Sequence, residues 1–375
     1  MWYFQQMLKV PISPAVSEQQ LEKTAQARLL DVLGGIPFVT LAPPGLEAPN
    51  PALAADFTVS LEAAGAQWTL VCKVKRLGQP RHVREAVYQL RHQLISMRNP
   101  RVYGIFIAPY LSEESIAVLR EESFGYLDFA GNCCLSFGSV FIERRGAPNP
   151  SVRRRALREI FAPKASRVLR VLLTDPDRPW RVTNLAQSAG VSLGQASNVR
   201  RALLDREWAQ ADASGVRLKS PIAILDAWRR EYKAPDFHVI HYHTLLHGEP
   251  LDSAIRAAFA TPAADQHLLL SSFSAARWLA PFARVSGQFF YADRMGDTLL
   301  RTALKLEPAP RGANIIVTHP KDDGVFIDRR QPAQGLWTTG PVQTYLDLAI
   351  AGERGREAAD HLRRETLDAV WHNLP

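Results

Sequence analysis

Gly190 and Ser192 stand two residues apart, between one short segment of apolar periodicity and the next. Glycine suits the left-handed backbone that often ends a helix, and Ser192 with Gln195 has the S-x-x-Q spacing of a capping box that begins one. The first segment starts near Thr183, a residue type that favours the N-cap position. The sequence therefore predicts a helix, a tight turn and a second helix.

Apolar residues on both sides extend this pattern. Val168 to Leu173 predict a preceding helix that closes at Asp175-Pro176, and the helix after Ser192 has a buried face spaced by three and four residues (Ala196, Val199, Leu203). Residues 208–210 and 215–219 alternate like two strands around a Ser-Gly turn. Three helices followed by such a hairpin predict a winged helix-turn-helix over residues 165–234.

Short polar and arginine side chains occupy the other faces of the helix after Ser192. Amide and guanidinium groups can pair with base edges in the major groove of DNA, and small residues allow close approach. A winged helix used only for protein contacts is the alternative, and the surrounding arginines favour double-stranded DNA. The predicted DNA-binding residues are Ser192, Gln195, Ser197, Asn198, Arg200, Arg201, Arg181, Arg217, Lys219, Arg153, Arg154 and Arg155.

Positive charge is concentrated between Arg144 and Arg170. This stretch holds nine basic residues against one acid, Glu159, and nine minus one equals the formal net charge of the whole chain, +8. A surface of this kind suits a polyanion, because it neutralises phosphates without regard to base sequence. We expect residues 147–164 to form a basic linker; a linker that is merely solvated is the alternative.

The first 146 residues predict a small α/β sandwich, because a β-hairpin precedes alternating helix and strand. Residues 56–61 and 68–74 alternate as two strands around Gly65, and residues 102–108 form an apolar strand of buried character. Helices are expected at residues 83–94 and 112–122, and a further strand at residues 126–129.

Asp56, the hairpin, Lys75 and the elements after them resemble the restriction-endonuclease-like PD-(D/E)XK core, over roughly residues 18–146. The resemblance implies that Asp56 and a second acid would hold magnesium while Lys75 polarises water or the scissile phosphate. Lys73 stands where the second acid belongs. We therefore expect no catalytic residue, metal or cofactor; the alternative is a nuclease that uses Asp56 and Lys75 with an acid recruited from Glu62 or Glu85.

Residues 235–375 predict a separate α/β domain for sensing, dimerisation or partner binding. Strands are expected in "QFFYAD" and "ANIIVTHP", and residues 342–367 are largely helical. His238, His241, His243 and His247 are candidate metal ligands, but only His241 and His243 share a strand face and no carboxylate or cysteine completes a usual set. The sequence therefore predicts no metal site.

Three stretches, "GYLDFAGNCCLSFGSVFIERRGAPN", "VSLGQASNVRRALLDREW" and "TYLDLAIAGERGREAADHL", resemble the AbiEi-type antitoxins of type IV toxin-antitoxin systems. The resemblance implies a transcriptional regulator that represses its own operon, with a cognate toxin as a partner. A two-fold symmetric operator would imply a homodimer.

Composition predicts a cytoplasmic α/β multidomain protein without membrane contact. The apolar fraction of 46% is ordinary for a globular chain, no stretch approaches the roughly 18 apolar residues of a membrane span, and the start lacks the features of a signal peptide. Three cysteines, Cys72, Cys133 and Cys134, cannot build a disulfide framework.

Overall fold

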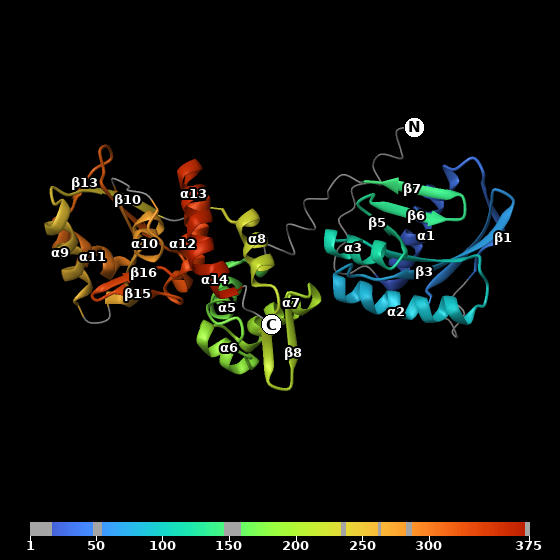
Figure 1. Cartoon of the computed structure of the whole chain (residues 1–375), viewed down its shortest axis with the longest axis horizontal. Helices are drawn as coiled ribbons and strands as arrows, with labels where there is room; N and C mark the ends of the chain where they lie inside the picture. The colour runs from blue at the N-terminus through green and yellow to red at the C-terminus, as the bar shows by residue number, and fades with distance from the viewer. Residues whose placement is uncertain are drawn as a thin grey trace. The chain divides into compact units, whose positions relative to one another are not determined.

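The structure is a computed structural model that describes residues 17–47, 55–145, 159–233, 238–261, 264–282 and 287–371. It forms two compact units, both of mixed α/β structure (Figure 1). Unit 1 comprises Met1–Ala156 with Asp205–Glu207, and unit 2 comprises Leu157–Leu204 with Trp208–Pro375. No helix in the described ranges is both long and apolar enough to cross a membrane. Arg153, Arg154 and Arg155 lie outside the described residues.

Unit 1 is built on a seven-stranded sheet whose strands lie side by side in chain order. The neighbours β3, β4 and β5 are parallel and all other pairs are antiparallel. The strands are β1 (Val39–Glu47), β2 (Phe57–Ala63), β3 (Ala66–Val74), β4 (Val102–Ala108), β5 (Gly125–Asp128), β6 (Cys133–Phe137) and β7 (Val140–Arg144).

Helices cover both faces of this sheet, as the prediction of an α/β sandwich requires. Helix α1 (Glu18–Gly34) packs with Phe57 on one face, and α2 (Pro80–Ser96) and α3 (Glu113–Glu121) pack with Phe106 on the other. The predicted elements from β2 to β5 are confirmed with small shifts at their ends, whereas α1, β1, β6 and β7 had not been predicted individually.

Unit 2 contains a second seven-stranded sheet, in the order β13-β10-β14-β12-β11-β16-β15. The expected strands "QFFYAD" and "ANIIVTHP" are confirmed as its neighbours β12 and β14. The strands are β10 (His238–His243), β11 (Leu268–Leu270), β12 (Gln288–Ala292), β13 (Glu307–Pro308), β14 (Ile315–His319), β15 (Arg330–Ala333) and β16 (Leu336–Thr338).

Helices pack around this second sheet, and those nearest the carboxyl end of the chain lie between it and α8 (Figure 1). The helical prediction for residues 342–367 is confirmed by three successive elements. The helices are α9 (Gly248–Phe259), α10 (Ser272–Leu279), α11 (Arg294–Leu304), α12 (Pro341–Ala349), α13 (Gly352–Leu362), the π-helix η4 (Arg363–Asp368) and α14 (Ala369–Trp371), with 3-10 turns at η2 (Ala264–Gln266) and η3 (Asp323–Phe326).

The remaining part of unit 2 consists of three helices, a hairpin and a fourth helix. These are α5 (Pro163–Thr174), α6 (Val182–Ala189), α7 (Leu193–Asp205), the strands β8 (Ala209–Asp212) and β9 (Gly215–Leu218), and α8 (Pro221–Glu231). The predicted helices and hairpin of this region are thus present.

One apolar cluster joins residues from both parts of unit 2, and the second sheet has a separate cluster of its own. Leu169 and Leu172 of α5 and Val199 of α7 belong to the same buried cluster as Tyr345 of α12 and Leu362 of α13. A domain boundary was expected near residue 234, but described residues on both sides of it belong to this cluster. In this fold, α5 is therefore packed between the α6–α7 pair and the carboxyl-terminal part.

Candidate nucleic-acid interface

The turn between α6 and α7 has the geometry that its sequence predicts. Gly190 adopts the left-handed conformation, with φ 60° and ψ 41°, and its N–H donates to the carbonyls at the end of α6. The Ser192 hydroxyl accepts a hydrogen bond of 3.2 Å from the Gln195 N–H. Because both helix ends are satisfied locally, the angle between α6 and α7 is well defined.

The predicted N-cap of α6 is wrong by two residues. Helix α6 begins at Val182 with Arg181 at its N-cap, and Thr183 lies inside the first turn, where its hydroxyl donates to Asn184 at 3.4 Å. The reason is tertiary: Trp180 and Val216 exchange backbone hydrogen bonds of 2.8 and 2.9 Å. These bonds hold the chain extended up to Arg181, so the helix starts directly after it.

Helix α7 buries one narrow stripe and leaves its other faces open. Ala196, Val199 and Leu203 are buried, as predicted. Ser192, Asn198 and Arg201 are exposed, and Gln195, Ser197 and Arg200 are half-buried. Within the described parts of the chain, the side chains of Asn198, Arg200 and Arg201 form no hydrogen bond or ion pair. Their donors and acceptors are therefore available to a ligand.

The hairpin after α7 is anchored to the segment before α6. Gly215 at its tip has φ 144°, and a Cβ there would lie 2.6 Å from the Trp180 carbonyl oxygen. Any other residue would push the hairpin away from Trp180, because real Cβ contacts do not become this short. Gly215 thus fixes the position of the hairpin relative to α6.

The two predicted basic residues of the hairpin differ in their surroundings. Lys219 is exposed, whereas Arg217 donates to Asp212 at 2.8 Å. The pKa of Asp212 is lowered, first by hydrogen bonds from Ser214 and then by the charge of Arg217. The charge of Arg217 is therefore balanced inside the hairpin, which leaves Lys219 and the exposed Arg181 as the available cations beside α7.

The basic stretch of the sequence is divided by the fold. Arg144, Arg145 and Lys164 are exposed, and Arg158 lies with Arg153 to Arg155 outside the described residues. Arg167 and Arg170, in contrast, point from α5 into the carboxyl-terminal part of unit 2. Arg167 makes two hydrogen bonds of 2.9 Å to Asp322, and Arg170 is buried against Gln343. These two arginines serve the fold and present no charge to a polyanion.

In unit 1, Lys73 neutralises the acid that the PD-(D/E)XK resemblance singles out. Its ammonium lies 2.8 Å from one oxygen of Asp56, and the other oxygen accepts a bond of 2.5 Å from the Val74 N–H. Lys75 is half-buried and its backbone N–H donates to Ile107 on the neighbouring strand. Both oxygens of the Asp56 carboxylate are therefore engaged within the protein.

The carboxylate electrostatically coupled to this pair comes from α1. Burial raises the pKa of Glu22, followed by the negative charges of Asp56 and Glu18, while Lys73 lowers it. Glu22 could not be identified from the sequence, because no motif marks it and α1 had not been predicted. Of the two acids considered there, Glu62 accepts from Gln67 near the hairpin turn and Glu85 is exposed on α2.

No metal centre is formed by the part of the chain that the structure describes: it contains no group of three or more His, Cys, Asp or Glu side chains placed to hold an ion. His241 and His243 lie on β10, where His241 is exposed and His243 half-buried. His247 precedes α9 as its N-cap residue.

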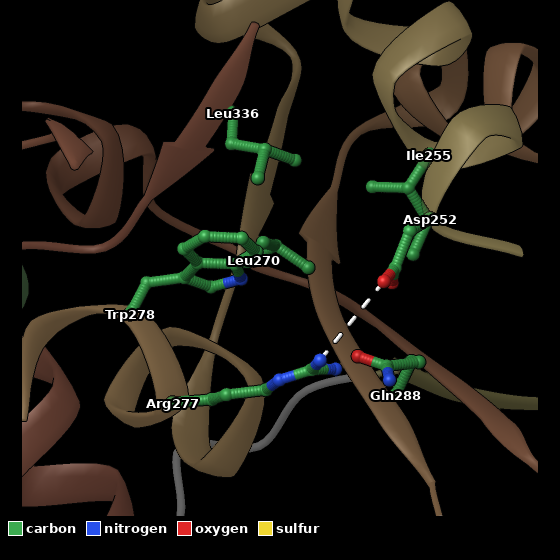
Figure 2. A pocket seen from close by; sticks show the side chains of 7 residues that line it. All are labelled: Asp252, Ile255, Leu270, Arg277, Trp278, Gln288 and Leu336. Carbon is green, nitrogen blue, oxygen red and sulfur yellow. Dashed lines mark ion pairs between the residues drawn. The ribbon is translucent and has the colours of Figure 1, made fainter. Parts of the chain in front are cut away.

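Unit 2 also contains a small pocket beside β12. Figure 2 shows Arg277 and Asp252 facing each other across it, and their side chains lie 3.9 Å apart. The lining residues are Asp252, Ile255, Leu270, Arg277, Trp278, Gln288 and Leu336.

Comparisons with known proteins give little further information. No protein-family model matches the chain, and no curated protein matches it. A solved structure described as "Structure of EndoMS-dsDNA2 complex" aligns with 32% of this chain at 20% sequence identity and a TM-score of 0.20. The alignment spans 48% of that structure's chain, about half of its length.

Proposed function

We propose that this chain is a transcriptional regulator that binds double-stranded DNA in a sequence-specific manner, with residues 165–234 acting as a winged helix-turn-helix. The observation that carries the proposal is the open face of α7. Asn198, Arg200 and Arg201 point away from the core and have no internal partner among the described residues. A capped turn on one side and an anchored hairpin on the other hold that face in a fixed orientation.

In this proposal α7 enters the major groove with its amino-terminal half. The amides of Gln195 and Asn198 would pair with adenine and the guanidinium of Arg201 with guanine, the pairings that suit these groups geometrically. Arg181 and Lys219 would contact phosphates on either side. Arg153, Arg154 and Arg155 would add phosphate contacts that are independent of base sequence.

Selection from a random duplex library tests base reading directly. Purified full-length protein is incubated with the library, the bound duplexes are amplified and sequenced over several rounds, and affinities for the enriched duplex and a scrambled one are measured. Enrichment of one motif, with at least about a thousandfold preference for it, is expected of a specific binder. Recovery of duplexes without any common motif would contradict the proposal.

Salt dependence separates phosphate contacts from base contacts. Replacing Arg153, Arg154 and Arg155 by alanine should weaken binding to the enriched and scrambled duplexes alike. The slope of log affinity against log salt should become shallower by up to about three, because each phosphate contact contributes about 0.9. An unchanged slope would remove these arginines from the interface.

We further propose that unit 1 does not cleave DNA. The ion pair of Lys73 with Asp56 supports this, because a cation occupies the space in which a divalent ion would need oxygen ligands. Supercoiled plasmid incubated with the protein and Mg²⁺ or Mn²⁺ should remain intact. Cleavage by the wild-type protein that disappears in Asp56→Ala would favour the alternative nuclease function instead.

The role of an autorepressing antitoxin, which the AbiEi resemblance implies, is a narrower form of the same proposal. It requires binding to the promoter of the chain's own operon and a toxin that co-purifies with the protein. Affinity purification from cells that express the native operon tests the second requirement. A protein that binds its promoter but retains no operon-encoded partner would be a plain regulator.

A further inference from the structure

Two adjacent residues in the first turn of α7 break local rules of helix formation. Leu193 is a large apolar side chain that is 56% exposed, although the apolar residues of a helix usually face the core. Gly194 follows it in the same turn, although glycine favours a helix less than every residue except proline. Either the fold or a ligand must account for this pair.

The fold gives no reason for a glycine at position 194. Two other glycines of this region have such a reason: Gly190 adopts the left-handed conformation, and a Cβ on Gly215 would lie 2.6 Å from the Trp180 carbonyl oxygen. Gly194 has an ordinary helical backbone. Outside the backbone of its own helix, an added Cβ would have the Ser192 hydroxyl oxygen as its nearest described neighbour, at 4.0 Å. Alanine would therefore fit position 194 without strain.

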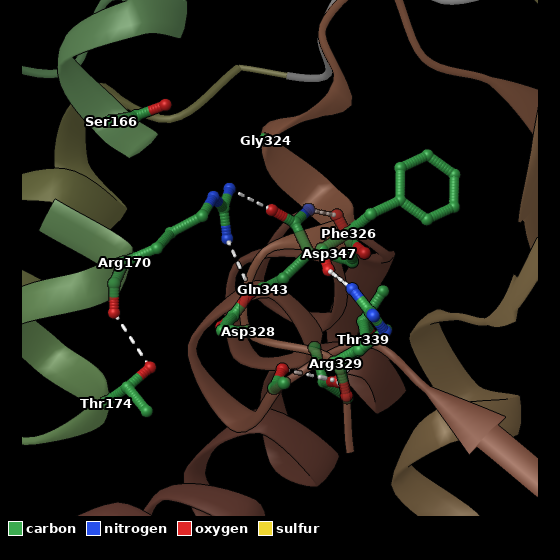
Figure 3. A network of polar contacts seen from close by, with 12 residues as sticks. Ser166, Arg170, Thr174, Gly324, Phe326, Asp328, Arg329, Thr339, Gln343 and Asp347 are labelled. Carbon is green, nitrogen blue, oxygen red and sulfur yellow. Dashed lines mark hydrogen bonds and ion pairs between the residues drawn. The ribbon is translucent and has the colours of Figure 1, made fainter. Parts of the chain in front are cut away.

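The exposed leucine also differs from other residues of unit 2 that break a local rule. Arg170 is a buried charge, and Figure 3 shows it reaching from α5 toward Gln343, whose side-chain oxygen accepts a hydrogen bond from it. Val191, two residues before the leucine, packs against the apolar cluster of α5 and α7, whereas Leu193 is directed to solvent. Single exposed leucines are common on protein surfaces, so the meaning of this one depends on what lies beside it.

Both residues lie on the open side of α7. Residues four and seven positions apart share one side of a helix, so Gly194 lies in line with Asn198 and Arg201, and all three are exposed. Leu193 stands at the edge of this row, in the same turn as Gly194. Because position 194 has no side chain, the backbone of α7 can come closer to a surface at the end of the helix that carries Leu193.

We propose that Leu193 contacts the 5-methyl group of a thymine in the major groove, and that Gly194 lets α7 approach the bases closely enough for this contact. Thymine is the one DNA base that presents a methyl group in that groove, and apolar side chains are suited to contact it. The inference rests on the proposed DNA-binding function and adds to it the base that the first turn of α7 recognises.

Replacement of thymine by uracil tests the contact, because uracil lacks only the 5-methyl group. Each thymine of the enriched duplex is replaced in turn, and the affinity of the full-length protein is measured by fluorescence anisotropy at constant ionic strength. At one thymine position the wild-type affinity should fall about fourfold, which corresponds to the burial of one methyl group. Leu193→Ala should bind the thymine and uracil duplexes equally at that position, whereas Leu193→Met, which keeps an apolar side chain of similar volume, should retain the preference.

Gly194→Ala tests the close approach. The variant should resist urea as well as the wild-type protein or better, because alanine favours the helix. Its affinity for the enriched duplex should nevertheless fall about tenfold or more, because the added methyl group separates α7 from the base edges. Gly34→Ala is the matched control, since it adds a methyl group at an exposed glycine of α1 where a Cβ likewise has room, and it should keep the wild-type affinity. Met295→Ala shortens an exposed apolar side chain in the first turn of α11 and should keep the thymine preference.

The outcomes separate this inference from the function on which it rests. Wild-type protein that binds every uracil duplex as tightly as the thymine duplex, a Leu193→Ala variant that keeps the thymine preference, or a Gly194→Ala variant with unchanged affinity overturns the inference while DNA binding stands. A Leu193→Ala variant that alters only self-association, measured by analytical ultracentrifugation, overturns it as well and assigns the leucine to a protein contact. Absence of any enriched motif contradicts the DNA-binding function and the inference together.

Discussion

The arginines of α5 and those of α7 are the same residue type in two helices of unit 2, yet they have opposite surroundings. Arg167 and Arg170 are directed to Asp322, Asp328 and Gln343, whereas Arg200 and Arg201 have no internal partner in the described chain. The contrast follows from burial, because α5 is enclosed by two parts of unit 2 and α7 buries only one stripe. Positive charge in a sequence therefore indicates a polyanion site only where the fold leaves the charge outside.

The largest expected effect is the loss of stability when a buried arginine of α5 is removed. Arg170→Ala should lower the free energy of unfolding of unit 2 by about 3 to 5 kcal/mol, because the buried side chains of Asp328 and Gln343 would lose their partner. Arg201→Ala should change it by less than about 0.5 kcal/mol, since Arg201 is exposed. Urea denaturation followed by circular dichroism measures both free energies of unfolding. Equal losses in the two variants would show that the arginines of α5 and α7 do not differ in their contribution to stability.

The exposed arginines of α7 should instead affect DNA affinity more than stability. Arg201→Ala should cost about 1 to 3 kcal/mol of binding free energy for the enriched duplex and much less for a scrambled one. Arg356→Ala removes an exposed charge from α13 and serves as the matched control, with little expected change on either duplex. If the two variants behaved alike, Arg201 would contribute only general charge.

The stability of unit 2 should depend on the protonation of Asp347. Burial raises its pKa in the folded state to about 6, so the folded protein binds this proton more tightly than the unfolded chain and gains stability as the pH falls. Between pH 7 and pH 5 the gain should be about 1 kcal/mol relative to Asp347→Asn, whose residue 347 does not titrate. Parallel stability curves for the two proteins would show that Asp347 does not titrate in this range.

The smallest expected effect is the coupling free energy between Arg167 and Asp322. Arg167 and Asp322 are about one-fifth and one-quarter exposed, so solvent screens their double hydrogen bond. A double-mutant cycle with Arg167→Ala and Asp322→Ala should give a coupling of about 1 kcal/mol. A coupling indistinguishable from zero would mean that Asp322 does not hold Arg167 in solution.

Local signals in the sequence were sufficient for the elements around α7. Gly190, Ser192 and the spacing of Ala196, Val199 and Leu203 act within a few residues of one another, and the structure confirms each of them. The N-cap at Thr183 failed because a contact to the distant Val216 determines where α6 begins. Local chemistry predicts a helix end only when tertiary bonds do not fix the chain beside it.

The surroundings of the polar residues could be predicted only in part. The sequence placed Lys73 where a second acid was expected, but the ion pair of Lys73 with Asp56 appears only in the structure. Glu22, Asp322 and Gln343 carry no motif, and their partners lie tens to more than a hundred residues away. Pairing over such separations depends on how the helices pack.

The apolar cluster shared by the two parts of unit 2 has a consequence for how such proteins diversify. Leu169 and Val199 share one apolar cluster with Tyr345 and Leu362. A gene fragment ending near residue 234 would therefore encode a protein with an exposed apolar surface that favours aggregation. Recombination between related genes could exchange this unit only as a whole.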